Sequence, residues 1–146
     1  MELKKYSASN REMLESEITI LKSIDHPNII RCYDVYLTVN NCYIVTEYCE
    51  GGDLYTLMKR FRGDQLSDSR VAAIMKDILS GFRYLSEQGV VHRDIKPANI
   101  FFRQGIAKLA DFGFAKKLSL LKEKENFNVG TPLYMAPEQI RSGLHD

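Results

Sequence analysis

A fixed succession of short motifs in the second half of the chain constrains its fold more than any other feature of the sequence. Residues 92–99 read His-Arg-Asp-Ile-Lys-Pro-Ala-Asn, residues 111–113 read Asp-Phe-Gly, and residues 136–138 read Ala-Pro-Glu. Two short runs of strand-forming residues, 100–102 and 106–110, separate the first motif from the second. Each motif alone is weak, but their joint order and spacing form a specific signal.

These motifs contain the groups that phosphoryl transfer requires. A carboxylate must orient the attacking hydroxyl and accept its proton, and oxygen ligands must hold magnesium, because the chemistry depends on positioning and charge neutralisation. Asp94, Asn99 and Asp111 supply this set. Each of them alone could cap a turn, and Lys96 could be a surface lysine, since such residues are common in loops. Their joint spacing favours the catalytic interpretation.

With these motifs, and with Glu-Gly-Gly-Asp-Leu at residues 50–54, the chain resembles the eukaryotic protein kinase superfamily from its first predicted helix to residues 136–138. The resemblance implies an α+β, protein-kinase-like, two-lobed fold. It also implies one partial kinase domain, with a small-lobe remainder in 1–48, a hinge in 49–53, and a large-lobe remainder in 54–146. The small-lobe remainder would keep part of an antiparallel sheet and one helix.

The resemblance also assigns roles to the motif residues. Asp94 would be the catalytic base, and Lys96 would contact the transferred phosphoryl group. Asn99 and Asp111 would hold two magnesium ions, so that ATP and Mg²⁺ are the expected cofactors. Glu17 would pair with a lysine of a small-lobe strand, although a lone helical glutamate is more often simply exposed.

The resemblance places nucleotide binding at the hinge and its neighbours. Thr46 has the position of the gatekeeper residue, although strand packing explains it almost as well. Glu47 and Cys49 would offer backbone groups to adenine, which leaves their side chains free to vary. Asp53 is placed to reach the ribose, and Phe101 is also assigned to the nucleotide site.

Two segments indicate the substrate class. Lys96 and the run Gly-Thr-Pro-Leu-Tyr-Met at residues 130–135 resemble serine/threonine kinases rather than tyrosine kinases. The expected partner is therefore a protein substrate with a Ser or Thr acceptor. Thr131 would order the substrate-binding loop beside Asp94 and Lys96, and the alternative is an ordinary turn threonine.

Arg93 is typical of kinases whose activation segment is ordered by a phosphate that pairs with this arginine. The usual acceptor position holds Phe127 in this chain. Either Ser119 or Thr131 therefore carries the phosphate, or an acidic residue such as Glu125 substitutes for it. The sequence leaves these alternatives open.

The sequence has no G-x-G-x-x-G loop and no V-A-I-K strand before the first predicted helix. The primary hypothesis is thus an ATP-dependent serine/threonine kinase whose catalytic domain is incomplete in this chain. A catalytically inactive kinase-like binding or regulatory module is the alternative, and an incomplete gene model is a third possibility.

Composition excludes several other classes. With 20 Lys+Arg and 19 Asp+Glu the net charge is +1, which predicts no nucleic-acid partner and no polybasic membrane anchor. The three cysteines are odd in number and form no C-x-x-C pair, so reduced thiols are expected. No run reaches the length of a membrane span and no apolar leader follows Met1, so we expect a cytoplasmic or nuclear location.

Helix and strand signals predict the first part of the chain. A capping box at residues 9–12 begins an amphipathic helix that ends at the turn of His26 and Pro27. Asn40 and Asn41 are expected to form the tight turn of a hairpin. The predicted strands are residues 29–39, 42–48, 90–91, 100–102 and 106–110.

Two further helices are predicted between the hairpin and the first motif. Asp53 caps a short helix that Gly63 ends, and Ser67 or Asp68 caps a longer one that continues to Gly89. The longer helix carries an apolar stripe typical of a core helix, and in a truncated domain part of it would stay exposed and lower the solubility. The stripe consists of Val71, Ile74, Met75, Ile78, Leu79, Phe82 and Leu85.

Overall fold

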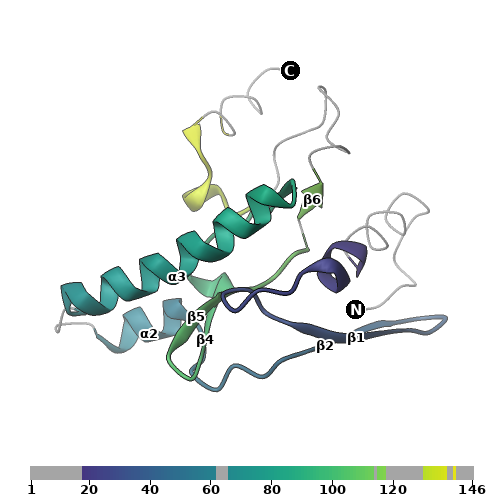
Figure 1. Cartoon of the computed structure of the whole chain (residues 1–146), viewed down its shortest axis with the longest axis horizontal. Coiled ribbons are helices and arrows are strands. Elements are labelled where there is room, and N and C mark those ends of the chain that lie inside the picture. Colours follow the sequence, from purple (N-terminus) through teal and green to yellow (C-terminus); the bar gives the residue numbers. More distant parts are fainter. Residues whose placement is uncertain (1–17, 62–65, 114, 118–129, 138–139, 141–146) are drawn as a thin grey trace.

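In a computed structural model of the chain, the structure describes residues 18–61, 66–113, 115–117, 130–137 and 140 (Figure 1). The predicted start of the first helix and the polar stretch after residue 117 lie outside this part. Residues 18–23 are helical, and Ile20 and Leu21 are buried there. The strands that follow are β1 (Cys32–Leu37), β2 (Cys42–Thr46), β3 (Val90–Val91), β4 (Ile100–Arg103), β5 (Ile106–Leu109) and β6 (Lys116–Lys117).

The β1–β2 hairpin is antiparallel, and its turn lies one residue earlier than predicted. The Thr38 N–H donates to the Asn41 carbonyl at 2.8 Å, and the Asn41 N–H donates to Thr38 Oγ1 at 3.0 Å. Asn41 is therefore part of the ladder, and the chain reverses at residues 39–40 instead of at Asn40 and Asn41. Thr38 decides the register because its hydroxyl bonds within the turn.

Strand β1 is shorter than the predicted strand because its first residues pair elsewhere. The Ile30 N–H donates to the Leu109 carbonyl at 2.8 Å, and the Leu109 N–H donates to the Asn28 carbonyl at 2.9 Å. Ile29 thus forms an isolated parallel bridge with β5 instead of extending β1. This contact ties the segment after the first helix to the β4–β5 hairpin.

Both predicted helices are present. The short helix α2 (Leu54–Arg60) begins at Asp53, whose carboxylate accepts the Thr56 N–H at 2.8 Å. The long helix α3 (Asp68–Glu87) begins at the Ser67 cap and is followed by Gly89 with φ of 63°. Gly63, the predicted end of α2, lies outside the described residues.

One apolar core joins these elements. It contains the buried side chains of the first helix, the inner face of α3 and alternate residues of β4 and β5. The strands form three two-stranded sheets, β1–β2, β3–β6 and β4–β5, and α3 runs along one side of the β4–β5 hairpin (Figure 1). The fold is therefore α+β, as predicted.

Only part of the α3 stripe is covered. Ile74 and Leu85 are buried, whereas other members of the stripe face outward. The exposed members are Val71, Met75, Leu79 and Phe82. No helix in the described ranges has the length and apolar character of a membrane-spanning segment. The three cysteines are free thiols, as predicted.

Candidate active site

The segment that begins at His92 is anchored from beneath by its own histidine. His92 is buried, its Nε2 donates to the Ala110 carbonyl at 3.0 Å, and its Nδ1 accepts the Asp94 N–H at 3.3 Å. This pattern corresponds to the neutral tautomer with the proton on Nε2. The Ala110 N–H in turn donates to the Asn99 carbonyl at 2.9 Å. The residue after Ala110 is Asp111, so these bonds bring the two motifs together.

Asp94 is the centre of a hydrogen-bonded cluster. Its Oδ2 accepts from Lys96 Nζ at 2.6 Å and from Asn99 Nδ2 at 3.0 Å, and its Oδ1 accepts from Thr131 Oγ1 at 2.8 Å. Lys96 Nζ also donates to Thr131 Oγ1 at 2.8 Å. Four side chains from two distant parts of the sequence thus converge on one carboxylate.

These donors determine the charge of Asp94. Burial by itself would raise the pKa of this carboxyl group, since the ionised form loses contact with water. The hydrogen bonds from Lys96, Thr131 and Asn99 and the positive charge of Lys96 outweigh burial, so the pKa lies below its usual value. Asp94 is therefore ionised at neutral pH. Burial lowers the pKa of His92 more than the Ala110 carbonyl raises it, which keeps that ring neutral.

The loop of Thr131 approaches the catalytic segment closely at Gly130. A Cβ atom at this glycine would lie 2.5 Å from the Arg93 carbonyl oxygen, and its φ is 118°. Any other residue would therefore clash and be strained at this position. Arg93 itself has a positive φ of 68°. Close packing of the two backbones places the Thr131 hydroxyl against Asp94.

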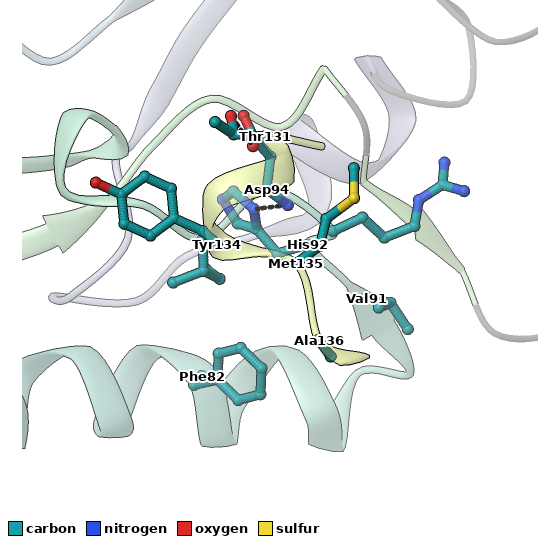
Figure 2. Close-up of a pocket in the computed structure, with 10 residues that line it drawn as sticks. Phe82, Val91, His92, Asp94, Thr131, Tyr134, Met135 and Ala136 are labelled. Atoms are coloured by element: carbon teal, nitrogen blue, oxygen red, sulfur yellow. Dashed lines mark hydrogen bonds between the residues drawn. The ribbon is translucent and has the colours of Figure 1, made fainter. Parts of the chain in front are cut away.

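A cavity of about 280 Å³ lies between these two segments and helix α3. Figure 2 shows Phe82 on the helix facing Tyr134 and Met135 across the hollow, with Asp94, His92 and Thr131 at its far side. The cavity wall is mostly apolar near α3 and polar at Asp94. The carboxylate cluster thus forms one end of a partly apolar cavity.

The segment after β2 docks on the edge of β4. The Gly51 N–H donates to the Phe102 carbonyl at 2.9 Å, and the Phe102 N–H donates to the Gly52 carbonyl at 2.9 Å. Asp53 forms a bridge with Phe101, which is half-buried on the same strand. Thr46 pairs with Cys32 at the end of the β1–β2 ladder. The linking segment is thereby fixed against the β4–β5 hairpin.

A protein-family comparison identifies this arrangement. The model described as protein kinase domain matches residues 1–146. The chain belongs to the protein kinase family. The expected two-lobed α+β kinase fold and the family assignment are thus confirmed, and the enzyme class of this family is the protein kinases.

Several curated kinases are similar to this chain. Serine/threonine-protein kinase pakA of Dictyostelium discoideum is 36% identical over 97% of this chain and 12% of its own length. Cell division control protein 7 of Schizosaccharomyces pombe is 41% identical over 96% of this chain and 13% of its own length. Serine/threonine-protein kinase ATG1a of Arabidopsis thaliana is 39% identical over 93% of this chain and 22% of its own length. The chain therefore spans less than a quarter of each relative.

In kinase terms, the catalytic-loop residues Asp94, Lys96 and Asn99 lie together with Thr131. Asp53 is used as the N-cap of α2 through both carboxylate oxygens, which accept from Thr56. The capping prediction is confirmed, and contact with ribose stays a prediction. Glu17 and Ser119, with Glu125, lie outside the described residues. The substrate-loop and regulatory roles of Thr131 and Arg93 also remain predictions.

Asn99 and Asp111 have the donor atoms that a kinase magnesium site needs. Asn99 uses Nδ2 for its bonds to the main chain and side chain of Asp94, so its amide oxygen remains available as an acceptor. The exposed carboxylate of Asp111 accepts from the Gly113 N–H at 3.3 Å. Within the described ranges no three His, Cys, Asp or Glu side chains cluster as metal ligands. An amide and a carboxylate oxygen fit Mg²⁺, which usually takes one or two protein carboxylates and completes its shell with phosphates and water.

Sequence reasoning missed the most heavily bonded side chain of the hinge region. Glu47 was expected to offer only backbone groups, yet its buried carboxylate bonds to Arg103 Nη1 at 2.6 Å and to Lys108 Nζ at 2.8 Å. Burial alone would raise the pKa of Glu47, but the bonds from Lys108, Arg103 and the Arg31 N–H hold it below its usual value. No motif announces these partners, because they are distant in sequence.

Proposed function

We propose that the protein transfers the γ-phosphoryl group of ATP to a serine or threonine hydroxyl of a protein substrate, with Mg²⁺ bound at Asn99 and Asp111. One observation supports this proposal above all: the buried Asp94 carboxylate is ionised and fixed by three side-chain donors. A rigid ionised carboxylate is what a hydroxyl nucleophile needs for orientation and deprotonation.

The bonding capacity of Asp94 leaves room for a substrate. A carboxylate offers about four lone-pair sites, and the donors from Lys96, Asn99 and Thr131 fill three of them. The remaining site is on Oδ1, where the substrate hydroxyl can donate. As its oxygen bonds to the γ-phosphorus, the bond from that phosphorus to the β–γ bridging oxygen breaks and the hydroxyl proton passes to Asp94.

Lys96 supplies positive charge at the same place. An ammonium group has three donors, of which one is directed to Asp94 and one to Thr131. The third is available for an oxygen of the transferred group. Bound Mg²⁺ would supply further charge neutralisation next to the phosphates. The expected acceptors are Ser and Thr because the Lys96–Thr131 bond supports the serine/threonine motif signature.

Replacement of Asp111 tests the proposed function. Asp111→Ala should lower Mg²⁺-dependent transfer of labelled phosphate from ATP to a generic protein acceptor by about 100-fold or more, since a charge-stabilising group is lost. Asp25→Ala is the matched control because Asp25 is also an exposed aspartate, paired only with the exposed Arg31 at 3.8 Å. Its activity should stay within twofold of wild type. Equal transfer by Asp111→Ala and the control would refute the assigned metal site.

A nucleotide-binding measurement separates an enzyme from a kinase-like binding module. ADP should raise the melting temperature by an amount that follows RT ln(1 + [L]/Kd). Stabilisation by ADP without any phosphate transfer would identify a binding module. The absence of both would refute ATP use altogether.

A further inference from the structure

Glu47 replaces part of the strand ladder with its own side chain. The Glu47 N–H donates to the Arg31 carbonyl at 2.9 Å, as expected for a hydrogen-bonded antiparallel pair. The Arg31 N–H does not return this bond to the Glu47 carbonyl but donates to Glu47 Oε1 at 2.8 Å. The main-chain carbonyl of Glu47 is thereby relieved of its regular partner.

The carboxylate that takes this bond is firmly anchored. Its Oε1 also accepts from Lys108 Nζ at 2.8 Å and its Oε2 accepts from Arg103 Nη1 at 2.6 Å, and the Glu47 side chain is 2% exposed. A buried carboxylate is unfavourable unless it is fully paired. Here β4, β5 and the segment before β1 each provide a donor, so the side chain has one conformation.

The backbone groups released by this arrangement are complementary to the edge of adenine. Among the described residues, neither the Glu47 carbonyl nor the Cys49 N–H has a hydrogen-bond partner. One is an acceptor and the other a donor, two residues apart. Adenine presents an amino N–H donor next to a ring nitrogen acceptor on one edge. The segment from Gly51 onward is fixed on β4, so only residues 48–50 lie between the two anchors.

We propose that the Glu47 carboxylate is a positioning residue for adenine recognition. By accepting the Arg31 N–H it keeps the Glu47 carbonyl available, and through Lys108 and Arg103 it holds the hinge in the conformation that adenine binds. This inference depends on the proposed binding of ATP, but it assigns the side chain a function that the backbone contacts alone do not require.

Removal of the carboxylate should redirect the Arg31 N–H to the main-chain carbonyl, which then competes with adenine. In Glu47→Met we expect the Kd of ADP, measured by titration calorimetry on the purified protein, to rise at least tenfold. The KM for ATP should rise by a similar factor, while kcat at saturating ATP stays within threefold because the Asp94 cluster is intact. Glu50→Gln is the control, since exposed Glu50 accepts from the Gln104 N–H and glutamine keeps that acceptor. Its Kd should stay within twofold.

Two additional variants separate positioning from a purely structural effect. Glu47→Met with Lys108→Met removes the buried cation as well, which restores a neutral, packed site and a melting temperature near that of wild type. Positioning predicts that ADP binding remains at least tenfold weaker, whereas a structural role predicts full recovery. Arg103→Gln removes only the partner whose side chain is 40% exposed, so the fold persists, and the Kd should rise two- to fivefold.

The outcomes distinguish this inference from the proposed function. If wild-type protein does not bind ADP, the proposed function is wrong. If wild type binds ADP and the double variant binds it equally well, or if Arg103→Gln leaves the Kd unchanged, the positioning by Glu47 is refuted and ATP use stands.

Discussion

Gly130 sets the distance between the Thr131 loop and the catalytic loop. An alanine there would place Cβ 2.5 Å from the Arg93 carbonyl oxygen at a φ of 118°. We expect Gly130→Ala to displace the Thr131 hydroxyl from Asp94 and to lower kcat at least tenfold. Backbone strain of about 1–3 kcal/mol should also reduce the free energy of unfolding.

Gly89→Ala is the matched control for this substitution. Gly89 also has a positive φ, of 63°, but a Cβ there meets nothing within 4 Å. The control should lower the unfolding free energy by about 1 kcal/mol through the left-handed backbone alone and leave kcat unchanged. Equal kcat in the two variants would show that the close approach at Gly130 does not position Thr131.

Single residues also show where sequence reasoning reached its limit. The motif predicted that Asp94, Lys96 and Asn99 act together, because their spacing in one loop already requires them to be neighbours. The pairing of Glu47 with Arg103 and Lys108 was not predictable, because these residues come from separate strands. Only the register of the hinge against β4 and β5 brings them together.

At the scale of elements, periodic signals were sufficient for the helices and insufficient for short strands. Helix α3 agreed with prediction at both ends because its apolar spacing is long and its cap and terminal glycine are unambiguous. Strand β6 (Lys116–Lys117) was missed, because two lysines in a polar run carry no strand signal. They form a strand only through pairing with β3.

Two leucines on α3 test how the helix is packed. Leu85 is 1% exposed in the core, whereas Leu79 is 60% exposed on the same helix. Leu85→Ala should lower the free energy of unfolding by about 2–5 kcal/mol, since it leaves a cavity. Leu79→Ala should change it by less than about 0.5 kcal/mol. Urea denaturation of both variants measures the difference, and similar losses would contradict the described helix orientation.

At the scale of the whole molecule, burial of neutral histidine links stability to pH. Burial lowers the pKa of both His92 and His26 below the usual 6.5. Below pH 6.5 the unfolded chain therefore binds protons that the folded chain does not, so stability falls as the pH is lowered. Glu47 and Asp94 act in the same direction at lower pH, because their folded pKa values lie below the unfolded values.

We expect the melting temperature to decrease steadily from pH 7.5 to pH 5.5. Each histidine contributes a slope of at most about 1.4 kcal/mol per pH unit. His92→Gln should flatten this dependence, although its absolute stability will be lower. A melting temperature that rises toward pH 5.5 would show that these rings are protonated in the folded protein.

The central claim is that the buried Asp94 carboxylate accepts the proton of a protein hydroxyl during phosphoryl transfer. The most direct test is single-turnover transfer from Mg²⁺-ATP in wild type and Asp94→Asn, with the Kd of ADP measured in parallel. Asparagine keeps the shape but cannot take the proton, so the transfer rate should fall about 10²- to 10⁴-fold while ADP binding stays within threefold. A transfer rate within threefold of wild type would contradict the account.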